Sequence, residues 1–357
     1  MRQSVYIFCL VCVFLSASAN AISYDITEIG AYSIAGINNS GQVAVQFDTR
    51  IYPGQRVGIW QNGSVQLLGM TGATTSQDFE QQEAKGINNN GHVIVRQTTY
   101  LTSYVWRDGV FTQIQPLPLS GSTTYGTEVL GINDHGHAVG QSWVGQPDGY
   151  HAFFWNGTTQ DICGRDVSGQ AVAINNFGQI VGQGCGQRGS FLYGNGQFFR
   201  FEDFGATDIN DSGIVVGQAT GFDSGGRAAL WDGDALQVLS SDWGESLAIN
   251  SHGAVVGAFS NGLEDNSAFM WDATNGILDL NEYIDPSLGV FLRQAVDIND
   301  LGQIIAYGRL SVGDQTSHRA YLLTPTAVPV PPAVWLFCSG LLGIVGFAKR
   351  NKAIQRH

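Results

Sequence analysis

The chain has 357 residues, of which only 13% are charged, and its formal net charge is −13. All 30 acidic residues lie between residues 22 and 327 together with 12 of the 17 Lys and Arg residues, so this region carries a charge of −18. Such a charge repels a phosphate backbone and argues against a nucleic-acid-binding protein.

The N-terminus has the features of a secretory signal peptide over residues 1–21. Arg2 gives it a positive start, and the apolar core from residue 5 to residue 15 is too short to span a membrane comfortably. Ala19 and Ala21 form an A-x-A cleavage site, so we expect export and a mature chain that begins after Ala21. The alternative is an anchor helix that stays attached.

A pattern of x-Ile-Asn-x-x-Gly followed by apolar residues then occurs seven times, at intervals of 35 to 50 residues. An aromatic stretch such as Phe153-Phe154-Trp155 follows each occurrence, usually with Asn-Gly or Asp-Gly behind it. We interpret each unit as four short strands, because these dipeptides are turn signals and the apolar runs between them are typical of buried strands. The isoleucines of the seven units are Ile37, Ile87, Ile132, Ile174, Ile209, Ile249 and Ile298.

Four strands in ~40–45 residues are typical of one blade of a β-propeller. Residues 24–30 look like a fourth strand without a unit of its own, and the seventh unit ends after Tyr321-Leu322-Leu323 without a fourth strand. We therefore predict an all-β, seven-bladed β-propeller of four-stranded repeats over residues 22–325, in which the N-terminal strand completes the last blade. An open solenoid or an array of sandwiches with frayed ends is the alternative.

Residues 22–325 contain two cysteines, Cys163 and Cys185, in the region that joins the third and fourth units. In an exported protein such a pair favours a disulfide over two free thiols. We expect this disulfide to fix a local loop.

A Pro-rich spacer at residues 326–332 precedes an uncharged apolar segment. We predict that residues 333–357 comprise a transmembrane helix and a basic tail, because the apolar stretch counted from Pro329 is just long enough to cross a bilayer. Lys349 and Arg350 follow this stretch directly, and a basic cluster there favours a cytoplasmic end.

The C-terminal sequence resembles the PEP-CTERM sorting signal. Val330, Pro331 and Pro332 stand where that signal has Pro-Glu-Pro, a Gly-rich apolar segment follows, and Lys349-Arg350 matches the basic end. The resemblance implies a Gram-negative bacterial protein that is handled by exosortase, a membrane peptidase or transpeptidase, and that is associated with exopolysaccharide in biofilm or floc. It also implies a precursor anchored in the inner membrane, which then reaches the cell surface or the extracellular matrix.

The repeats resemble the extracellular HAF repeat family, which is named for a His-Ala-Phe sequence that here is His151-Ala152-Phe153. Ser267-Ala268-Phe269 is the next closest match. The resemblance covers about 300 residues and implies extracellular repeats, but no particular activity.

Sequence patterns of serine nucleophiles, P-loops and zinc proteases are absent, so we assign no catalytic residue, no metal ligand and no cofactor. Asp208-Ile209-Asn210-Asp211 has the opening spacing of a calcium loop. Ala219 stands where such a loop has Glu, however, which favours a repeat turn over a Ca²⁺ site. Four histidines at or beside the turns are interpreted as exposed turn residues, with a metal site on one rim as the alternative. They are His92, His135, His137 and His252.

Five tryptophans recur at one position of the repeat, which favours packing between blades over sugar stacking. They are Trp60, Trp106, Trp155, Trp231 and Trp271. Trp143 and Trp243 lie outside that position and are the candidates for an exposed platform that binds a ligand.

We therefore expect a non-enzymatic, exported repeat protein that contacts exopolysaccharide or another surface protein. A secreted polysaccharide lyase or glycoside hydrolase is the alternative, because propeller sites are assembled from loops of several blades and leave little trace in sequence. A ring that serves only as a spacer is a third reading.

Overall fold

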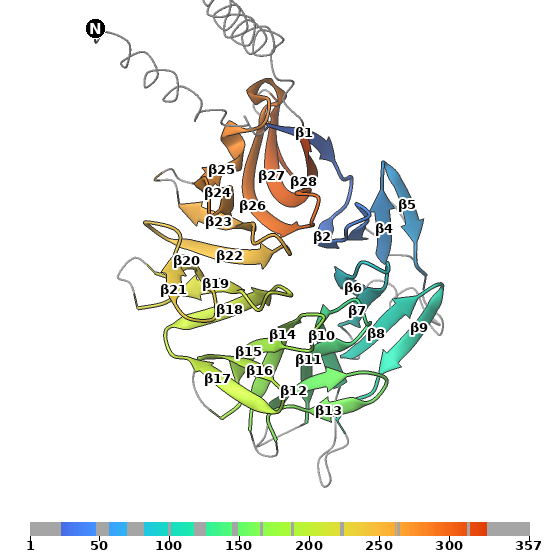
Figure 1. Ribbon diagram of the computed structural model, residues 1–357. Coiled ribbons are helices and arrows are strands. Elements are labelled where there is room, and N and C mark those ends of the chain that lie inside the picture. Colours follow the sequence, from blue (N-terminus) through green and yellow to red (C-terminus); the bar gives the residue numbers. More distant parts are fainter. Residues whose placement is uncertain are drawn as a thin grey trace, which may run out of the picture. The chain divides into compact units, whose positions relative to one another are not determined.

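A computed structural model describes most of the repeat region (Figure 1). The described residues are 23–47, 57–69, 82–98, 101–117, 126–144, 149–164, 167–186, 189–221, 225–260, 262, 265–312 and 315–326. Asp25–Thr324 form one compact unit. The predicted signal peptide and residues 327–357, with the predicted membrane helix and sorting signal, lie outside the described residues.

The strands form seven four-stranded antiparallel sheets, which we call blades 1 to 7. Blade 1 contains β2 (Ser33–Ile37), β3 (Val43–Gln46), β4 (Val57–Gln61) and β5 (Ser64–Leu67), and blade 2 contains β6 (Gln82–Ile87), β7 (Val93–Gln97), β8 (Thr102–Arg107) and β9 (Val110–Ile114). Blade 3 contains β10 (Gly126–Ile132), β11 (Ala138–Trp143), β12 (Tyr150–Trp155) and β13 (Thr159–Asp161), and blade 4 contains β14 (Gly169–Ile174), β15 (Ile180–Gly184), β16 (Ser190–Gly194) and β17 (Gln197–Phe201).

Blade 5 contains β18 (Phe204–Ile209), β19 (Val215–Ala219), β20 (Arg227–Trp231) and β21 (Leu236–Val238), and blade 6 contains β22 (Gly244–Ile249), β23 (Val255–Ser260), β24 (Asn266–Asp272) and β25 (Gly276–Asp279). Two short 3-10 helices, η1 (Leu280–Glu282) and η2 (Pro286–Leu288), connect blade 6 to blade 7. Blade 7 contains β26 (Val290–Ile298), β27 (Ile304–Val312), β28 (Gln315–Thr326) and, from the other end of the chain, β1 (Ser23–Glu28).

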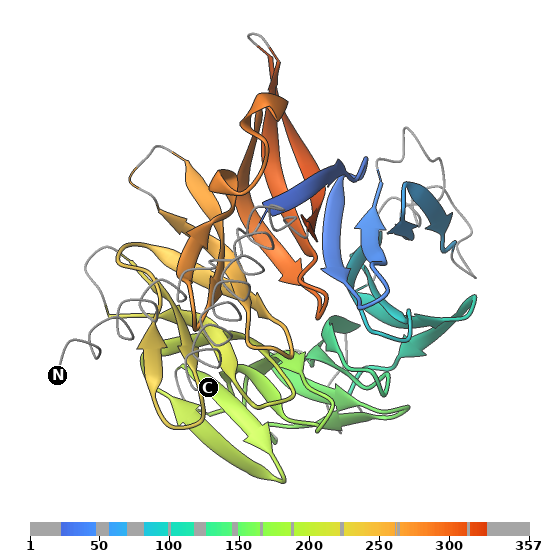
Figure 2. The ribbon, with the colours of Figure 1, turned by 45° about the horizontal axis from the view of Figure 1, so that its top comes forward.

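The blades surround a central opening, with the first strand of each blade next to it (Figure 2). Because β1 pairs with β28, the last blade is completed by the N-terminal strand. The backbone N–H of Ile29 continues this pairing and donates to the carbonyl oxygen of Ala320 at 2.8 Å. The predicted seven-bladed propeller and the predicted closing strand are therefore confirmed. In the described part of the chain, no helix has the length and apolarity needed to cross a membrane.

The Asn-x-x-Gly turn between the first and second strands has the same construction in every blade. In blade 1, Oδ1 of Asn38 accepts hydrogen bonds from the backbone N–H groups of Ser40 and Gln42, both at 3.0 Å. Gly41 takes a φ of 71°, in the left-handed region that glycine adopts without strain. The repeat asparagine therefore holds its own turn.

The recurring tryptophans pack between blades, as predicted. Trp60 of blade 1 is 4% exposed and lies in one apolar cluster with Ile305 and Leu322 of blade 7. Trp155 of blade 3 lies in a cluster with Ile94 of blade 2. Trp60 and Trp155 are thus each buried against the preceding blade, and burial of such aromatic area stabilises the contacts between blades.

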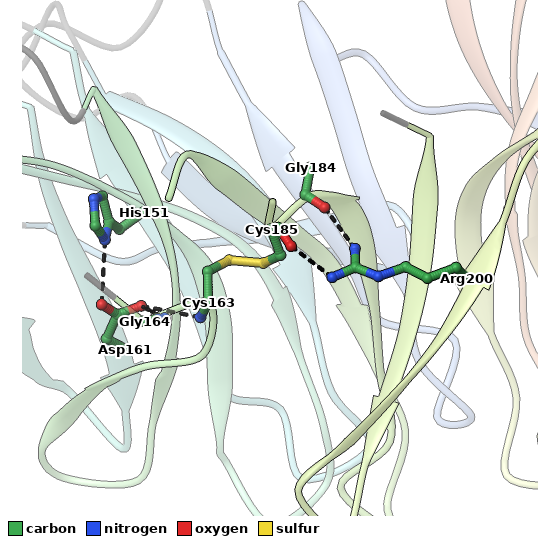
Figure 3. Close-up of a disulfide and its surroundings, with 7 residues drawn as sticks. All are labelled: His151, Asp161, Cys163, Gly164, Gly184, Cys185 and Arg200. Carbon is green, nitrogen blue, oxygen red and sulfur yellow. Dashed lines mark hydrogen bonds and ion pairs between the residues drawn. A yellow bond between two sulfur atoms is a disulfide. The ribbon is translucent and has the colours of Figure 1, made fainter. Parts of the chain in front are cut away.

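A disulfide joins Cys163, which follows β13, to Cys185, which follows β15, with their Cα atoms 4.8 Å apart (Figure 3). It links blade 3 to blade 4. Oδ1 of Asp161 accepts from the backbone N–H of Cys163 at 3.0 Å, and Arg200 donates to the carbonyl oxygen of Cys185. Both ends of the link are therefore held by side chains of their own blades.

Candidate functional site

The repeat asparagines form a closed ring of hydrogen bonds around the channel. Nδ2 of each asparagine donates to the backbone carbonyl oxygen of the equivalent asparagine in the next blade, at 2.8 to 3.1 Å. All seven are buried. They are Asn38, Asn88, Asn133, Asn175, Asn210, Asn250 and Asn299. Sequence reasoning explained the turn bonds of these residues but missed the ring, although the strict choice of an amide at all seven positions was a signal for it.

A hollow of about 200 Å³ lies inside this ring, and the repeat isoleucines and the residues after each asparagine line it. Three of the latter are acidic, and each accepts a backbone N–H from the preceding blade. Asp134 accepts from Asn89 at 2.8 Å, and Asp300 accepts from Ser251 at 2.9 Å. At this end of the channel, hydrogen bonds therefore connect the turn of each of these blades to the turn of the next.

Two further carboxylates, Asp208 and Asp297, occupy the position before the repeat isoleucine, where other blades have Gly or Ala. Oδ2 of Asp208 accepts from the N–H of Ile249 at 3.0 Å, and Oδ2 of Asp297 accepts from the N–H of Ile37 at 2.8 Å. Each carboxylate thus clasps the next blade. Burial, the main cause, raises the pKa of Asp208 to about 7 and that of Asp297 to about 6.

The residues of the calcium-like sequence that starts at Asp208 make three different structural contacts. Asp208 clasps blade 6, Asn210 belongs to the asparagine ring, and Asp211 accepts from the N–H of Asn176 at 2.8 Å. Within the described ranges, no three His, Cys, Asp or Glu side chains are grouped as a metal site would require.

The turn histidines lie on blades 2, 3 and 6. Nε2 of His135 is 3.1 Å from the carbonyl oxygen of Asn176, and the His135 and His137 rings are 5.7 Å apart. Desolvation lowers the pKa of His92 and of His137, and the nearby Arg107 lowers both further. At neutral pH, the uncharged imidazole is therefore favoured for His92 and His137.

A second hollow, of about 360 Å³, lies between blades 6 and 7 at the end of β22 opposite the asparagine ring. It contains one of the two predicted platform residues, Trp243. We call it the Trp243 hollow. The other residues that line it are Glu245, Ala258, Asn266, Arg293, Gln294, Tyr307, Gly308 and His318. Sequence reasoning missed these, because they come from six strands of two blades.

Local backbone bonds fix Trp243 at this rim. Its carbonyl oxygen accepts from the N–H of Ser260 at 2.8 Å, and the next residue, Gly244, donates to the carbonyl oxygen of Gly226 at 3.1 Å. The indole also packs close to Gly225, where an added Cβ would lie 3.2 Å from Cδ1 of the ring. The partly buried ring is thus held in place at the edge of the hollow.

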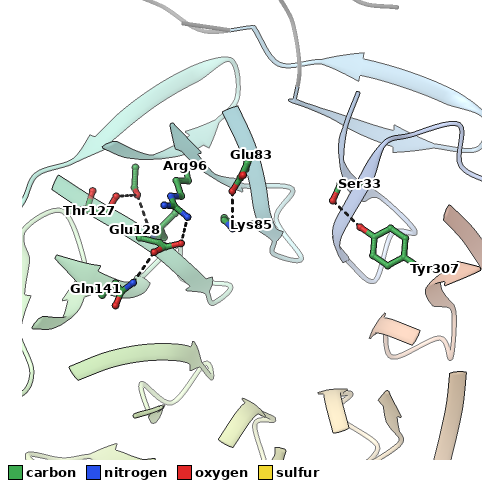
Figure 4. A network of polar contacts seen from close by, with 10 residues as sticks. Ser33, Glu83, Lys85, Arg96, Thr127, Glu128, Gln141 and Tyr307 are labelled. Carbon is green, nitrogen blue, oxygen red and sulfur yellow. Dashed lines mark hydrogen bonds and ion pairs between the residues drawn. The ribbon is translucent and has the colours of Figure 1, made fainter. Parts of the chain in front are cut away.

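The hollow exists because a small residue stands where other blades have a long polar one. Glu245 on β22 pairs with Ala258 on β23, whereas the equivalent Glu128 in blade 3 pairs with Gln141. Nε2 of Gln141 donates to Glu128 at 2.8 Å, and Arg96 forms an ion pair with the same carboxylate (Figure 4). The corresponding space in blade 3 is therefore filled by side chains.

Glu245 accepts a hydrogen bond from Nε2 of Gln294 at 3.0 Å. The hydroxyl of Tyr307 is turned toward blade 1, where it lies 2.9 Å from Oγ of Ser33 and accepts from the N–H of Ile34 at 2.8 Å (Figure 4). The hollow thus presents an aromatic face, a carboxylate, two amides, a guanidinium and an imidazole.

Trp143, the other predicted platform, lies on blade 3 and does not line this hollow. Its ring packs against Tyr150 with centroids 4.7 Å apart. The structure therefore separates the two predicted platform residues.

No known family model matches the chain, and no curated protein matches it. Among solved structures, it is similar to YCF48 from Cyanidioschyzon merolae, with a TM-score of 0.50 and 11% identity over 85% of this chain and 99% of the other. It is also similar to virginiamycin B lyase from Staphylococcus aureus, with a TM-score of 0.46 and 11% identity over 84% and 99% of the two chains. A gluconolactonase from Xanthomonas campestris gives 0.42 and 10% identity over 87% and 93%. At this identity, the similarity to YCF48 shows the propeller fold alone.

Proposed function

We propose that this chain is an exported, cell-surface or extracellular repeat protein that binds a saccharide of the surrounding matrix in the Trp243 hollow. One observation carries the proposal: a hollow of about 360 Å³ brings an aromatic side chain together with polar side chains from a second blade. Its volume lies within the ~300–1,000 Å³ range of small-molecule sites.

The chemistry of the lining suits a sugar. An indole offers a flat apolar face to the C–H groups of a pyranose ring, and it is a large contact area with a rigid geometry. Asn266 and Gln294 supply amides, and Glu245 supplies a carboxylate that accepts from hydroxyl groups. A mixed aromatic and polar lining of this kind combines affinity with orientation.

The lining favours binding over hydrolysis. Glycosidases generally use two carboxyl groups that flank the scissile bond. Glu245 is the one carboxylate among the described residues that line the hollow. The neighbouring Asp265 has each of its oxygens paired with an arginine. A lyase would need a base; the hydroxyl of Tyr307 is engaged with blade 1, which leaves the imidazole of His318 as the candidate for that alternative.

Export and sorting belong to the same proposal. The signal peptide over residues 1–21 delivers the chain, exosortase acts at Val330-Pro331-Pro332, and the C-terminal helix anchors the precursor in the inner membrane. The disulfide between Cys163 and Cys185 supports an extracytoplasmic address, because such bonds persist in oxidising compartments.

Titration calorimetry of the purified protein with the exopolysaccharide of its host tests the binding proposal. We expect saturable binding that Trp243→Ala weakens by about tenfold or more and that the control Trp143→Ala leaves unchanged. Depolymerisation of the polysaccharide would favour the enzyme alternative. Binding that is equal in all three proteins would remove the Trp243 hollow from consideration.

A further inference from the structure

We infer that the saccharide bound in the Trp243 hollow is a carboxylated sugar, a uronic acid, whose carboxylate pairs with the guanidinium groups of Arg293 and Arg309; this inference rests on the proposed function. The first observation is where the cationic side chains lie. Only 12 Lys and Arg residues stand against 30 acids between residues 22 and 327. Three of these 12 lie on β26, β27 and β28 of blade 7. Two of the three, Arg293 and Arg309, pair with Asp265 of blade 6, and Arg293 also lines the hollow.

The strand pairing within blade 7 places these charges. Arg293 lies on β26, Arg309 on β27 and His318 on β28. The pairing of β27 with β28 sets Arg309 opposite His318, four residues beyond the pair of Ile305 with Leu322 in the buried cluster. Arg293 and Arg309 therefore form a cationic wall on the blade 7 side of the hollow.

The second observation is an uneven charge balance in that wall. Nη2 of Arg293 lies 3.1 Å from Oδ1 of Asp265, and Nη1 of Arg309 lies 2.5 Å from Oδ2 of the same carboxylate. One negative charge thus serves two guanidinium groups. Both arginine side chains remain about 40% exposed, so donors of each fork still reach solvent.

A carboxylate is the group that this arrangement fits best. The guanidinium fork matches carboxylate geometry with two parallel N–H···O bonds, which are stronger than bonds between neutral groups. Arg309 is further steadied by the Phe291 ring, 5.0 Å from its guanidinium carbon. Nε of Arg293 is buried and has no acceptor among the described residues, so this guanidinium has a hydrogen bond still to make.

Blade 6 and blade 7 contribute different chemical groups to the hollow. Trp243 and Glu245 belong to blade 6, whereas Arg293 and His318 belong to blade 7. Gln294 donates to one oxygen of Glu245, and the remaining acceptor sites of this carboxylate are free to accept from sugar hydroxyls, while its charge directs an acid group toward blade 7. A uronic acid would therefore stack on blade 6 with its carboxylate toward blade 7.

Three probes separate the charge from the sugar: oligogalacturonate, the same oligosaccharide after reduction of its carboxyl groups, and dextran. We expect the wild-type protein to bind oligogalacturonate at least about tenfold more tightly than its reduced form. Arg293→Gln should remove this preference. Arg319→Gln is the matched control, because Arg319 is 41% exposed on the same blade but pairs with Glu28 away from the hollow.

Asp265→Asn should increase the affinity for oligogalacturonate, a result that misfolding of the variant would not produce. Removal of the competing carboxylate frees both guanidinium groups, so we expect oligogalacturonate to bind several-fold more tightly and the reduced form to be unaffected. Equal affinity for the charged and reduced probes, or weaker uronate binding in Asp265→Asn, would overturn the inference and leave saccharide binding standing. Lack of binding to all three probes and to the host polysaccharide would remove the proposed function itself.

Discussion

Nδ2 of Asn299 donates to the backbone carbonyl oxygen of Asn38 at 2.9 Å, which joins two residues 261 positions apart in the chain. The same bond between neighbouring blades spans only 35 to 50 positions. The bond therefore closes a ring in which no asparagine is terminal. It works beside the β1–β28 pairing, so the propeller is closed both at its axis and at its outer edge.

We predict that Asn133→Asp destabilises the fold by about 1–3 kcal/mol. Aspartate keeps the Oδ1 acceptor for the turn N–H of His137, but it replaces the donor to the carbonyl oxygen of Asn175 with a second acceptor. Urea unfolding followed by tryptophan fluorescence measures the change. Ser212→Ala, at an exposed turn position of blade 5, is the control and should cost less than about 0.5 kcal/mol. Equal costs would mean that the ring adds nothing to the turns.

The clasping carboxylates predict an unusual dependence of stability on pH. The folded pKa values of Asp208 and Asp297 are about 7 and about 6, both above the ordinary 3.8, so the folded state binds protons more tightly than the unfolded state. Their contribution to stability is therefore fully present below about pH 4 and is lost as the pH rises through 6 and 7. One pKa unit corresponds to about 1.4 kcal/mol, so the lost part is on the order of a few kcal/mol for each carboxylate.

Asp208→Ala isolates this contribution, because Ala173 and Ala248 occupy the same repeat position in blades 4 and 6. We expect the difference in unfolding free energy between wild type and variant to change with pH in the direction just described. Paired urea titrations at about pH 4.5 and about pH 8 measure it. A constant difference at both pH values would show that Asp208 is not protonated in the folded state.

The disulfide predicts a dependence on redox conditions. Removal of the link in a Cys163→Ser, Cys185→Ser double variant should cost about 3 kcal/mol, since the bond closes a loop of 22 residues. Reductant should lower the melting temperature of the wild type and leave that of the double variant unchanged. Non-reducing mass mapping that finds both thiols free in the exported protein would contradict the assignment.

The repeat made the blades and their closure readable from sequence. Each unit carries its own turn, in which one asparagine and one glycine act within five residues, and the orphan strand before residue 30 matched the missing one after Leu323. The asparagine ring was not readable in the same way. Its bonds depend on which atom of Asn133 faces blade 4, and that follows from the placement of whole blades.

The sequence predicted one residue of the candidate site but not the hollow that surrounds it. Trp243 stood out because it broke the repeat. The hollow around Trp243 was not predictable, because it depends on Ala258 lying opposite Glu245. A shift of one residue in the strand register would have placed a different residue opposite Glu245. Arg293 lies 50 residues beyond Trp243 in the next blade, and only the packing of blades brings them to one hollow.

The sorting proposal predicts where the protein accumulates in its host. Replacement of Val330, Pro331 and Pro332 by alanine should leave export intact and block processing by exosortase. We expect the full-length protein to stay in the inner membrane fraction, where immunoblotting after cell fractionation detects it. The control replaces Pro325, outside the proposed signal. Normal release of the triple variant would contradict the assignment.

The repeat itself supplies the variant that should fill the hollow. In blade 3, Gln141 stands opposite Glu128 and donates to it at 2.8 Å, and the fold accommodates this pair. Ala258→Gln copies the pair into blade 6, where the new side chain should bond Glu245 and occupy the space beside Trp243. We expect saccharide affinity to fall by about tenfold or more while the unfolding free energy changes by less than about 1 kcal/mol. Gln141→Ala, the reverse change, should create no second site, because blade 3 has no tryptophan before its first strand. Undiminished affinity in Ala258→Gln, with folding intact, would place the ligand elsewhere on the ring.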